Sequence, residues 1–214
     1  MQLIQKNDII LFQGDSITDC GRDRSNLENM GNGYPRMLDM YLKSEFPDFN
    51  LKLLNLGISG SRVRDLAMRW QADCLDLTPT LLSVLIGIND TWRRYDQNSP
   101  TSAEEYERGL DAILTQARDQ YVSLKIVVME PFLMPYPADK QGWREDLDPK
   151  IMAARRVAKR HGAIYVPLDG LFASACMHTP DYYWSADGVH PTQAGHGLIA
   201  RAWLRAVCGG SCEI

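Results

Sequence analysis

Short apolar runs alternate with longer segments of helical periodicity along the chain, and this alternation limits the possible folds more than any other feature. The runs are mostly apolar throughout, as expected of strands that are covered on both faces of a sheet. They span residues 9–13, 51–55, 82–86, 125–130 and 164–167. Repeated strand and helix units of this kind predict an α/β fold around a parallel five-stranded sheet.

The segments between these runs predict the helices. They cover residues 34–43, 63–75, 103–120, 146–161 and 193–207, with a short helix near Leu171. Ser102 and Glu105 have the spacing of a capping box at the start of the third helix, and Thr192 is placed to cap the last one. The 214 residues contain no internal repeat or Gly/Ser linker, so we expect a single domain over residues 1–214.

Composition and charge exclude several classes of partner. A hydrophobic content of 45% with 23% charged residues is ordinary for a soluble protein. No apolar run approaches the roughly 20 residues of a membrane helix, and residues 1–13 lack the pattern of an export signal. We therefore expect a cytoplasmic protein with no membrane partner. The net charge of −4 disfavours nucleic acid, because phosphate binding needs a concentrated basic surface.

The cysteines give no sign of a disulfide framework or a metal site. Five cysteines are scattered along the chain without a CxxC pair or a nearby histidine cluster. We interpret them as free thiols in a reducing compartment.

Unusual residues gather where the predicted strands end. GDS (residues 14–16) follows the first run, LGISG (56–60) the second and GIND (87–90) the third, while DGVHP (187–191) lies in the last long connection. In open α/β sheets, ligands bind outside the carboxyl ends of the strands. Each motif alone has an ordinary explanation, but together they predict a functional site. Two long loops, residues 20–33 and 131–143, also favour function.

Ser16 has three interpretations. It could cap a helix or sit in a turn, which is the common role of a serine after a strand. It could belong to a phosphate-binding loop, but the carboxylates of Asp15 and Asp19 would repel a phosphate. The third interpretation is a nucleophile, which needs a general base nearby.

The DGVHP motif supplies such a base. Asp187 and His190 are three residues apart, so the carboxylate can hold one imidazole nitrogen while the other takes a proton from Ser16. Pro191 favours an extended backbone at His190, which keeps this residue just outside the following helix. An isolated Asp-x-x-His also occurs in surface turns. The remaining histidines lack a carboxylate at this spacing and are expected to be structural: His161, His178 and His196.

Three donors could stabilise an oxyanion beside this serine. They are the backbone N–H of Ser16, the backbone N–H of Gly60 and the side-chain amide of Asn89, each at a strand end. Glycine at position 60 lets the main chain approach a substrate and adopt a positive φ. Taken singly, Gly60 could be a turn glycine and Asn89 a turn or cap residue.

These motifs together resemble the SGNH superfamily, also called GDSL esterases and lipases. Longer stretches, GDSITDCGR, GISGSRVRDL, IGINDTWRRYD and DGVHPTQAGH, are similar to bacterial intracellular acetylxylan esterases. The resemblance implies a flavodoxin-like, three-layer α/β/α fold with Ser16 as nucleophile, His190 as general base and Asp187 as its partner. It also implies the same three oxyanion donors, no metal or cofactor, short acyl groups on sugars as substrate, and a homo-oligomer.

Candidate substrate contacts follow from the same regions. Residues 92–95 follow Asn89 after a gap of two residues, and their rings and guanidinium groups suit a sugar, although they could equally be a packed loop with solvated arginines. The candidates are Asp15, Trp92, Arg93, Tyr95 and Trp184. The acetylxylan esterases carry a tryptophan immediately before the triad aspartate, whereas here Ser185 and Ala186 separate Trp184 from Asp187.

Rival functions are separated by specific features. A lipid-directed acylhydrolase would share every catalytic residue and differ in acyl-length preference. A flavodoxin-type binding module would need a phosphate-friendly first loop, which the two aspartates oppose. The G-x-S-x-G elbow of the α/β-hydrolases does not occur in the sequence.

Overall fold

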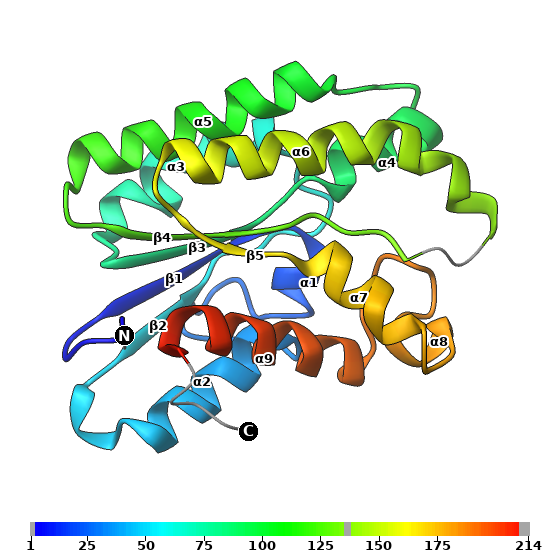
Figure 1. Cartoon of the computed structure of the whole chain (residues 1–214). Helices are drawn as coiled ribbons and strands as arrows, with labels where there is room; N and C mark the ends of the chain where they lie inside the picture. The colour runs from blue at the N-terminus through cyan, green and yellow to red at the C-terminus, as the bar shows by residue number, and fades with distance from the viewer. Residues whose placement is uncertain (1–2, 135–137, 210–214) are drawn as a thin grey trace.

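The computed structural model describes residues 3–134 and 138–209 and has a five-stranded parallel sheet at its centre (Figure 1). The strands lie in the order β2-β1-β3-β4-β5. Their bounds are Ile9–Gly14 (β1), Lys52–Asn55 (β2), Leu81–Leu85 (β3), Lys125–Met129 (β4) and Ile164–Val166 (β5). The predicted α/β fold is confirmed, and each strand boundary lies within one residue of its expected position.

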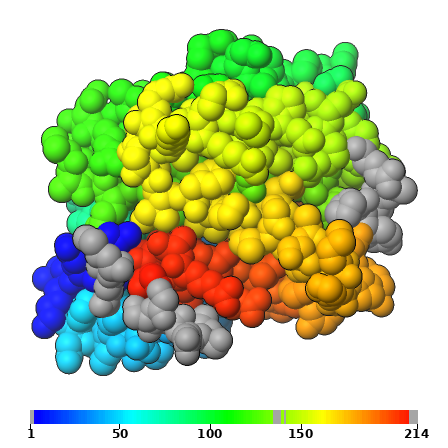
Figure 2. Space-filling view, in the orientation of Figure 1, coloured from blue at the N-terminus to red at the C-terminus, as the bar shows by residue number. Residues whose placement is uncertain are grey.

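Side chains alternate between two hydrophobic cores, one on each face of the sheet. On β1, Ile10 and Phe12 enter one core and Leu11 enters the other. The first core is covered by α2 (Tyr34–Glu45), α7 (Leu168–Cys176) and α9 (Gln193–Cys208). The second is covered by α3 (Val63–Asp73), α5 (Ala103–Gln120) and α6 (Arg144–Arg160). Figure 1 shows the three layers, and in Figure 2 the red surface of α9 lies beside the light-blue surface of α2.

Both predicted helix caps are present. Ser102 and Glu105 form a reciprocal capping box at the start of α5, and the Thr192 hydroxyl accepts a hydrogen bond from the N–H of Gly195 at the start of α9. Helix α3 stops at Asp73, two residues before its expected end, and a 3₁₀ turn (Leu75–Leu77) follows it. No helix within the described ranges is long and apolar enough to cross a membrane.

Three α-helices within the described residues were not expected, and two of them bear on the site. Helix α1 (Ser16–Asp19) follows β1, and helix α4 (Ile88–Asp96) follows β3 in a segment where no helix was predicted. The third is α8 (Asp181–Trp184). In α4, Ile88, Trp92 and Tyr95 recur at i, i+4 and i+7, a helical spacing masked by the polar residues between them. The aromatic and arginine residues at 92–95 therefore lie on a helix.

Candidate active site

The reversal of strand order places three motif segments next to one another. Strand β1 pairs with β2 on one side and with β3 on the other, all in parallel. The segments that leave these strands at their carboxyl ends are α1, the loop 56–62 and α4. This is the switch point at which ligands bind in open α/β sheets.

Ser16, His190 and Asp187 form a hydrogen-bonded chain. Ser16 is the first residue of α1, and its Oγ lies 2.9 Å from Nε2 of His190. Nδ1 of His190 lies 2.7 Å from Oδ2 of Asp187. The other carboxylate oxygen, Oδ1, accepts hydrogen bonds from the N–H groups of Val189 and His190, at 2.9 and 2.7 Å. The carboxylate is thereby fixed, so Nδ1 carries the proton and Nε2 is free to accept one from Ser16.

The charges and hydrogen bonds of Ser16, His190 and Asp187 favour a basic imidazole. The hydrogen bond that Nδ1 of His190 donates to Asp187 raises the pKa of His190 above its ordinary value of 6.5, and burial only partly opposes this effect. For Asp187, burial alone would raise the pKa, but hydrogen bonds from the His190 side chain and from two backbone N–H groups lower it far below 3.8. Asp187 therefore stays ionised while His190 gains and loses a proton.

Asp15 lies beneath the serine instead of facing solvent. Its side chain is 1% exposed, and Oδ1 accepts a hydrogen bond of 3.0 Å from the N–H of Ile17, which caps α1. Burial raises the pKa of Asp15 to about 7. Asp15, a candidate substrate contact, is thus buried and caps the helix that begins at Ser16.

Asp19 joins α1 to the loop that carries Gly60. Its Oδ2 accepts hydrogen bonds from the N–H and the hydroxyl of Ser59, at 3.0 and 3.1 Å, and from Arg24 at 2.6 Å. Burial alone would raise the pKa of Asp19, but the hydrogen bonds from Arg24 and Ser59 lower it below 3.8. Asn55 at the end of β2 adds a second link, since Nδ2 donates to the Thr18 carbonyl at 2.8 Å. The relative position of Ser16 and Gly60 is fixed by these contacts.

The three candidate oxyanion donors lie on the three adjoining segments. The N–H of Ser16 belongs to the first turn of α1, where backbone N–H groups have no intrahelical acceptor. Gly60 has a φ of +83°, and its N–H has no acceptor among the residues that the structure describes. Asn89 is 2% exposed, and Nδ2 donates to the Ser61 carbonyl at 3.2 Å, which leaves its second N–H available.

An aromatic wall stands beside His190. The centroid of the Trp92 ring lies 5.7 Å from that of His190 and 5.4 Å from that of Trp143. Trp143 in turn stacks on Tyr95, with 5.1 Å between the ring centroids. The ammonium of Lys140 lies 5.9 Å from the Trp92 ring and 5.7 Å from the Trp143 ring. Trp92 and Tyr95 were expected near the site. Trp143 and Lys140 were not singled out, because only their place in the long loop 131–143 indicated a role.

A polar pocket is lined in part by Gly60. Its volume is about 480 Å³. The lining residues are Ile58, Ser59, Gly60, Ser61, Arg62, Asp65, Arg69, Arg93 and Gln97. Arg93, a candidate substrate contact, thus lies between this pocket and Asn89, to which Nη2 donates at 3.3 Å.

Trp184 is not brought to this group of residues. It packs against the core of the α2 and α9 face and lines a separate groove with Tyr183, Met37 and Leu198. Its carbonyl accepts a hydrogen bond from the N–H of Thr192. Trp184, which Ser185 and Ala186 separate from Asp187, therefore lines another surface.

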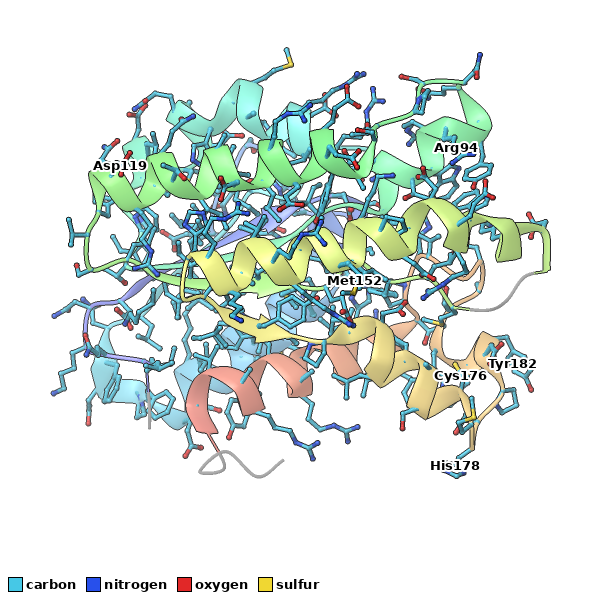
Figure 3. The ribbon with its side chains drawn as sticks, turned by 45° about the horizontal axis from the view of Figure 1, so that its top comes forward. Arg94, Asp119, Met152, Cys176, His178 and Tyr182 are labelled. Carbon is cyan, nitrogen blue, oxygen red and sulfur yellow. The ribbon has the colours of Figure 1, made fainter. Side chains whose placement is uncertain are left out.

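The other histidines lie outside the chain of Ser16, His190 and Asp187. His196 is 3% exposed, accepts a hydrogen bond from the N–H of Tyr34, and has its pKa lowered to about 4 by burial. His161 contacts Asp111 on α5 at 2.9 Å, and His178 is exposed near the end of α7 (Figure 3). Within the described residues, no group of three His, Cys, Asp or Glu side chains could hold a metal ion.

Comparison with known proteins identifies the family of the chain. The sequence pattern of the GDSL-like Lipase/Acylhydrolase family matches residues 12–198. An acetylxylan esterase of Geobacillus stearothermophilus is 32% identical over 206 residues, which cover 92% of this chain and 93% of that protein. A crystal structure of Axe2, an acetylxylan esterase from Geobacillus stearothermophilus, superposes with a TM-score of 0.90 at 31% identity, over 99% of this chain and 98% of the other.

Further structures point the same way. A crystal structure described as a GDSL-like lipase from Parabacteroides merdae has a TM-score of 0.92 at 37% identity, covering 97% of this chain and 99% of that one. Axe2 has also been solved as two catalytic mutants, one with a serine and one with a histidine replaced by alanine. The chain therefore belongs to the GDSL-like lipase/acylhydrolase family.

Proposed function

We propose that this acylhydrolase is a serine esterase that removes acetyl groups from sugars, with acetylated xylo-oligosaccharides as its substrate class. The observation that carries the mechanism is the chain of two hydrogen bonds from Ser16 through His190 to Asp187, at 2.9 and 2.7 Å. Ser16 is the nucleophile, His190 the general base and then acid, and Asp187 the group that fixes the imidazole tautomer.

The reaction proceeds through an acyl-enzyme. Nε2 of His190 takes the Ser16 proton as Oγ attacks the ester carbonyl, and the N–H groups of Ser16, Gly60 and Asn89 hold the resulting oxyanion. The imidazolium returns its proton to the departing sugar hydroxyl. Water then attacks the acyl-Ser16 ester with His190 again as base, and acetate leaves.

The surroundings of Ser16 support a sugar ester with a short acyl group. Indole rings such as Trp92 and Trp143 pack well against the apolar faces of a sugar ring, and the polar pocket beside Gly60 offers donors and acceptors for hydroxyl groups. Neither the wall nor this pocket is lined by a continuous aliphatic surface that would favour a long acyl chain. The likeness to the Geobacillus acetylxylan esterase supports the same substrate class.

Substrate class is tested by product release. We expect rapid acetate release from acetylated xylo-oligosaccharides, and faster cleavage of p-nitrophenyl acetate than of the octanoate ester. Ser16→Ala should lower both acetate activities by at least about 10³-fold, since the nucleophile is lost.

Two outcomes would contradict the proposal in different ways. Activity retained in Ser16→Ala would exclude Ser16 as nucleophile. Strong octanoate cleavage with inert xylo-oligosaccharides would leave the mechanism in place and assign the enzyme to lipid-type esters. Arg160→Gln, on the exposed surface between α5 and α6, serves as a matched variant outside the site.

A further inference from the structure

The Asn89 side chain is held by contacts on both of its polar atoms. Nδ2 donates to the Ser61 carbonyl at 3.2 Å, and Oδ1 accepts a hydrogen bond from Nη2 of Arg93 at 3.3 Å. Of the two polar atoms of the Asn89 amide, only the oxygen can accept a hydrogen bond from the guanidinium, and only the nitrogen can donate one to the carbonyl. The two contacts therefore select one of the two amide orientations, the one that leaves an N–H of Nδ2 free.

Arg93 is itself fixed in place. It lies one helical turn after Asn89 on α4, where it pairs with Asp96 and has a side chain only 19% exposed. Its Nη2 would lie 3.7 Å from a Cβ added at Gly60. One guanidinium thus borders two of the three proposed oxyanion donors.

The first turn of α4 also fixes the loop that carries Gly60. Asp90 accepts a hydrogen bond of 3.1 Å from the N–H of Val63, while Asn89 holds the carbonyl of Ser61. Arg62 completes this region by donating to the carbonyl of Ser99 at 3.2 Å. The loop and the helix are therefore locked together, and the Asn89 amide depends on Arg93 for its remaining contact.

We propose that Arg93 is a positioning residue for the oxyanion site: its hydrogen bond to Oδ1 directs the free N–H of Asn89 at the developing negative charge. This inference rests on the proposed function, because it assumes that Asn89 is an oxyanion donor. It assigns Arg93 a role in kcat, whereas a direct sugar contact would act mainly on KM.

Arg94 provides a matched control on the same helix. Arg94 pairs with Glu145 and Asp146 on α6, at 2.8 and 3.1 Å, and Figure 3 shows it at the α4 end of the molecule. Its removal deletes the same charge and a comparable number of contacts without touching Asn89.

The experiment compares Arg93→Met with Arg94→Met on p-nitrophenyl acetate. We expect Arg93→Met to lower kcat about 10- to 100-fold with KM within about threefold, since one misdirected oxyanion donor costs up to about 10²- to 10³-fold. Arg94→Met should keep its kcat. Arg93→Lys, which retains a donor and the charge, should recover part of the loss.

A double-mutant cycle then tests the route of the effect. If Arg93 acts through Asn89, Arg93→Met should change kcat little in the Asn89→Ala background. Inhibition by methylboronic acid, which forms a tetrahedral adduct with a serine, should weaken in Arg93→Met by a factor similar to the loss in kcat.

Other results would overturn the inference. A rise in KM at unchanged kcat would make Arg93 a substrate contact, and a full loss in the Asn89→Ala background would show that it acts independently. Activity that survives Ser16→Ala would instead refute the proposed function. The two failures are therefore distinguishable.

Discussion

Two carboxyl groups near His190, those of Asp187 and Asp15, have pKa values shifted in opposite directions. Asp187 accepts two backbone hydrogen bonds and one from the imidazole, so its pKa lies far below 3.8. Asp15 accepts a single backbone hydrogen bond while fully buried, and its pKa is raised to about 7. Burial outweighs the hydrogen bonds at Asp15, whereas at Asp187 the hydrogen bonds outweigh burial, so only Asp187 stays fully ionised beside the base.

The state of His190 predicts the acidic limb of the pH profile. Catalysis needs the neutral imidazole, and Asp187 raises the pKa of His190 above 6.5, so kcat/KM should fall as pH drops through a value above 6.5. In Asp187→Asn we expect the limb to move to lower pH and kcat to drop about 10³- to 10⁴-fold, because the tautomer is no longer fixed. Profiles of p-nitrophenyl acetate hydrolysis from pH 5 to 9 measure both effects.

A nearby aspartate separates this effect from a general change of charge. Asp181→Asn, on α8, removes one carboxylate outside the hydrogen-bonded chain and should leave the limb in place. An unchanged limb in Asp187→Asn would show that His190 is not the titrating base.

At this scale, local spacing was sufficient for some residues and not for others. Asp187 and His190 could be paired from the sequence because three residues separate them within one turn. Trp143 and Lys140 could not be assigned to the wall, because their contacts with Trp92 depend on the path of a long loop. Trp184 is close to Asp187 in sequence, yet its ring faces another groove.

At the scale of elements, α1 is packed directly on the chain that leaves β2. A Cβ added at Gly57 would lie 2.4 Å from the N of Asp19 and 2.7 Å from the carbonyl carbon of Thr18. Both atoms belong to the backbone of α1, so no side-chain rotation could relieve the clash. The short helix that begins at Ser16 can hold this position only against a glycine.

Gly57→Ala should therefore shift α1 and the serine with it. We expect a loss of roughly 1–3 kcal/mol in the free energy of unfolding, typical of overpacking, and at least about tenfold in kcat, because small displacements of catalytic groups are costly. Gly197→Ala in α9 is the matched control, since nothing lies within 4 Å of its added Cβ. That variant should be as stable as the wild type or more stable by up to about 1 kcal/mol.

Urea unfolding and esterase assays of the two glycine variants give the comparison. Equal effects of the two substitutions would contradict the packing argument.

Among the elements themselves, strands and long helices could be predicted because their apolar residues repeat over many positions. Helix α4 was missed because its three apolar residues stand in a segment of only nine, Ile88–Asp96.

For the whole molecule, buried acids make stability depend on pH. The folded protein keeps a proton on Asp15 up to a pH of about 7, whereas the unfolded chain releases it near 3.8. Between these values the folded state binds more protons, so this group makes the protein less stable as pH rises. Burial gives Asp90 a pKa of about 7 as well, and the two charges repel.

Asp15→Asn should remove the contribution of Asp15. We expect the free energy of unfolding of this variant, relative to that of the wild type, to be roughly 1–3 kcal/mol higher at pH 8 than at pH 5. Urea unfolding at the two pH values measures the difference. Asp119→Asn, at the exposed far end of α5 in Figure 3, should show no such gain. A pH-independent difference between Asp15→Asn and the wild type would contradict a buried protonated Asp15.

The sequence distance between Ser16 and His190 has a consequence for protein synthesis. The two side chains are 174 residues apart in the chain and 2.9 Å apart in space. A ribosome releases the α1 segment early and the segment carrying Asp187 and His190 much later. If Ser16 and His190 act together as proposed, a nascent chain has no esterase activity until both segments are free to fold. The first acetate released in a translation reaction would then report that a complete domain has folded.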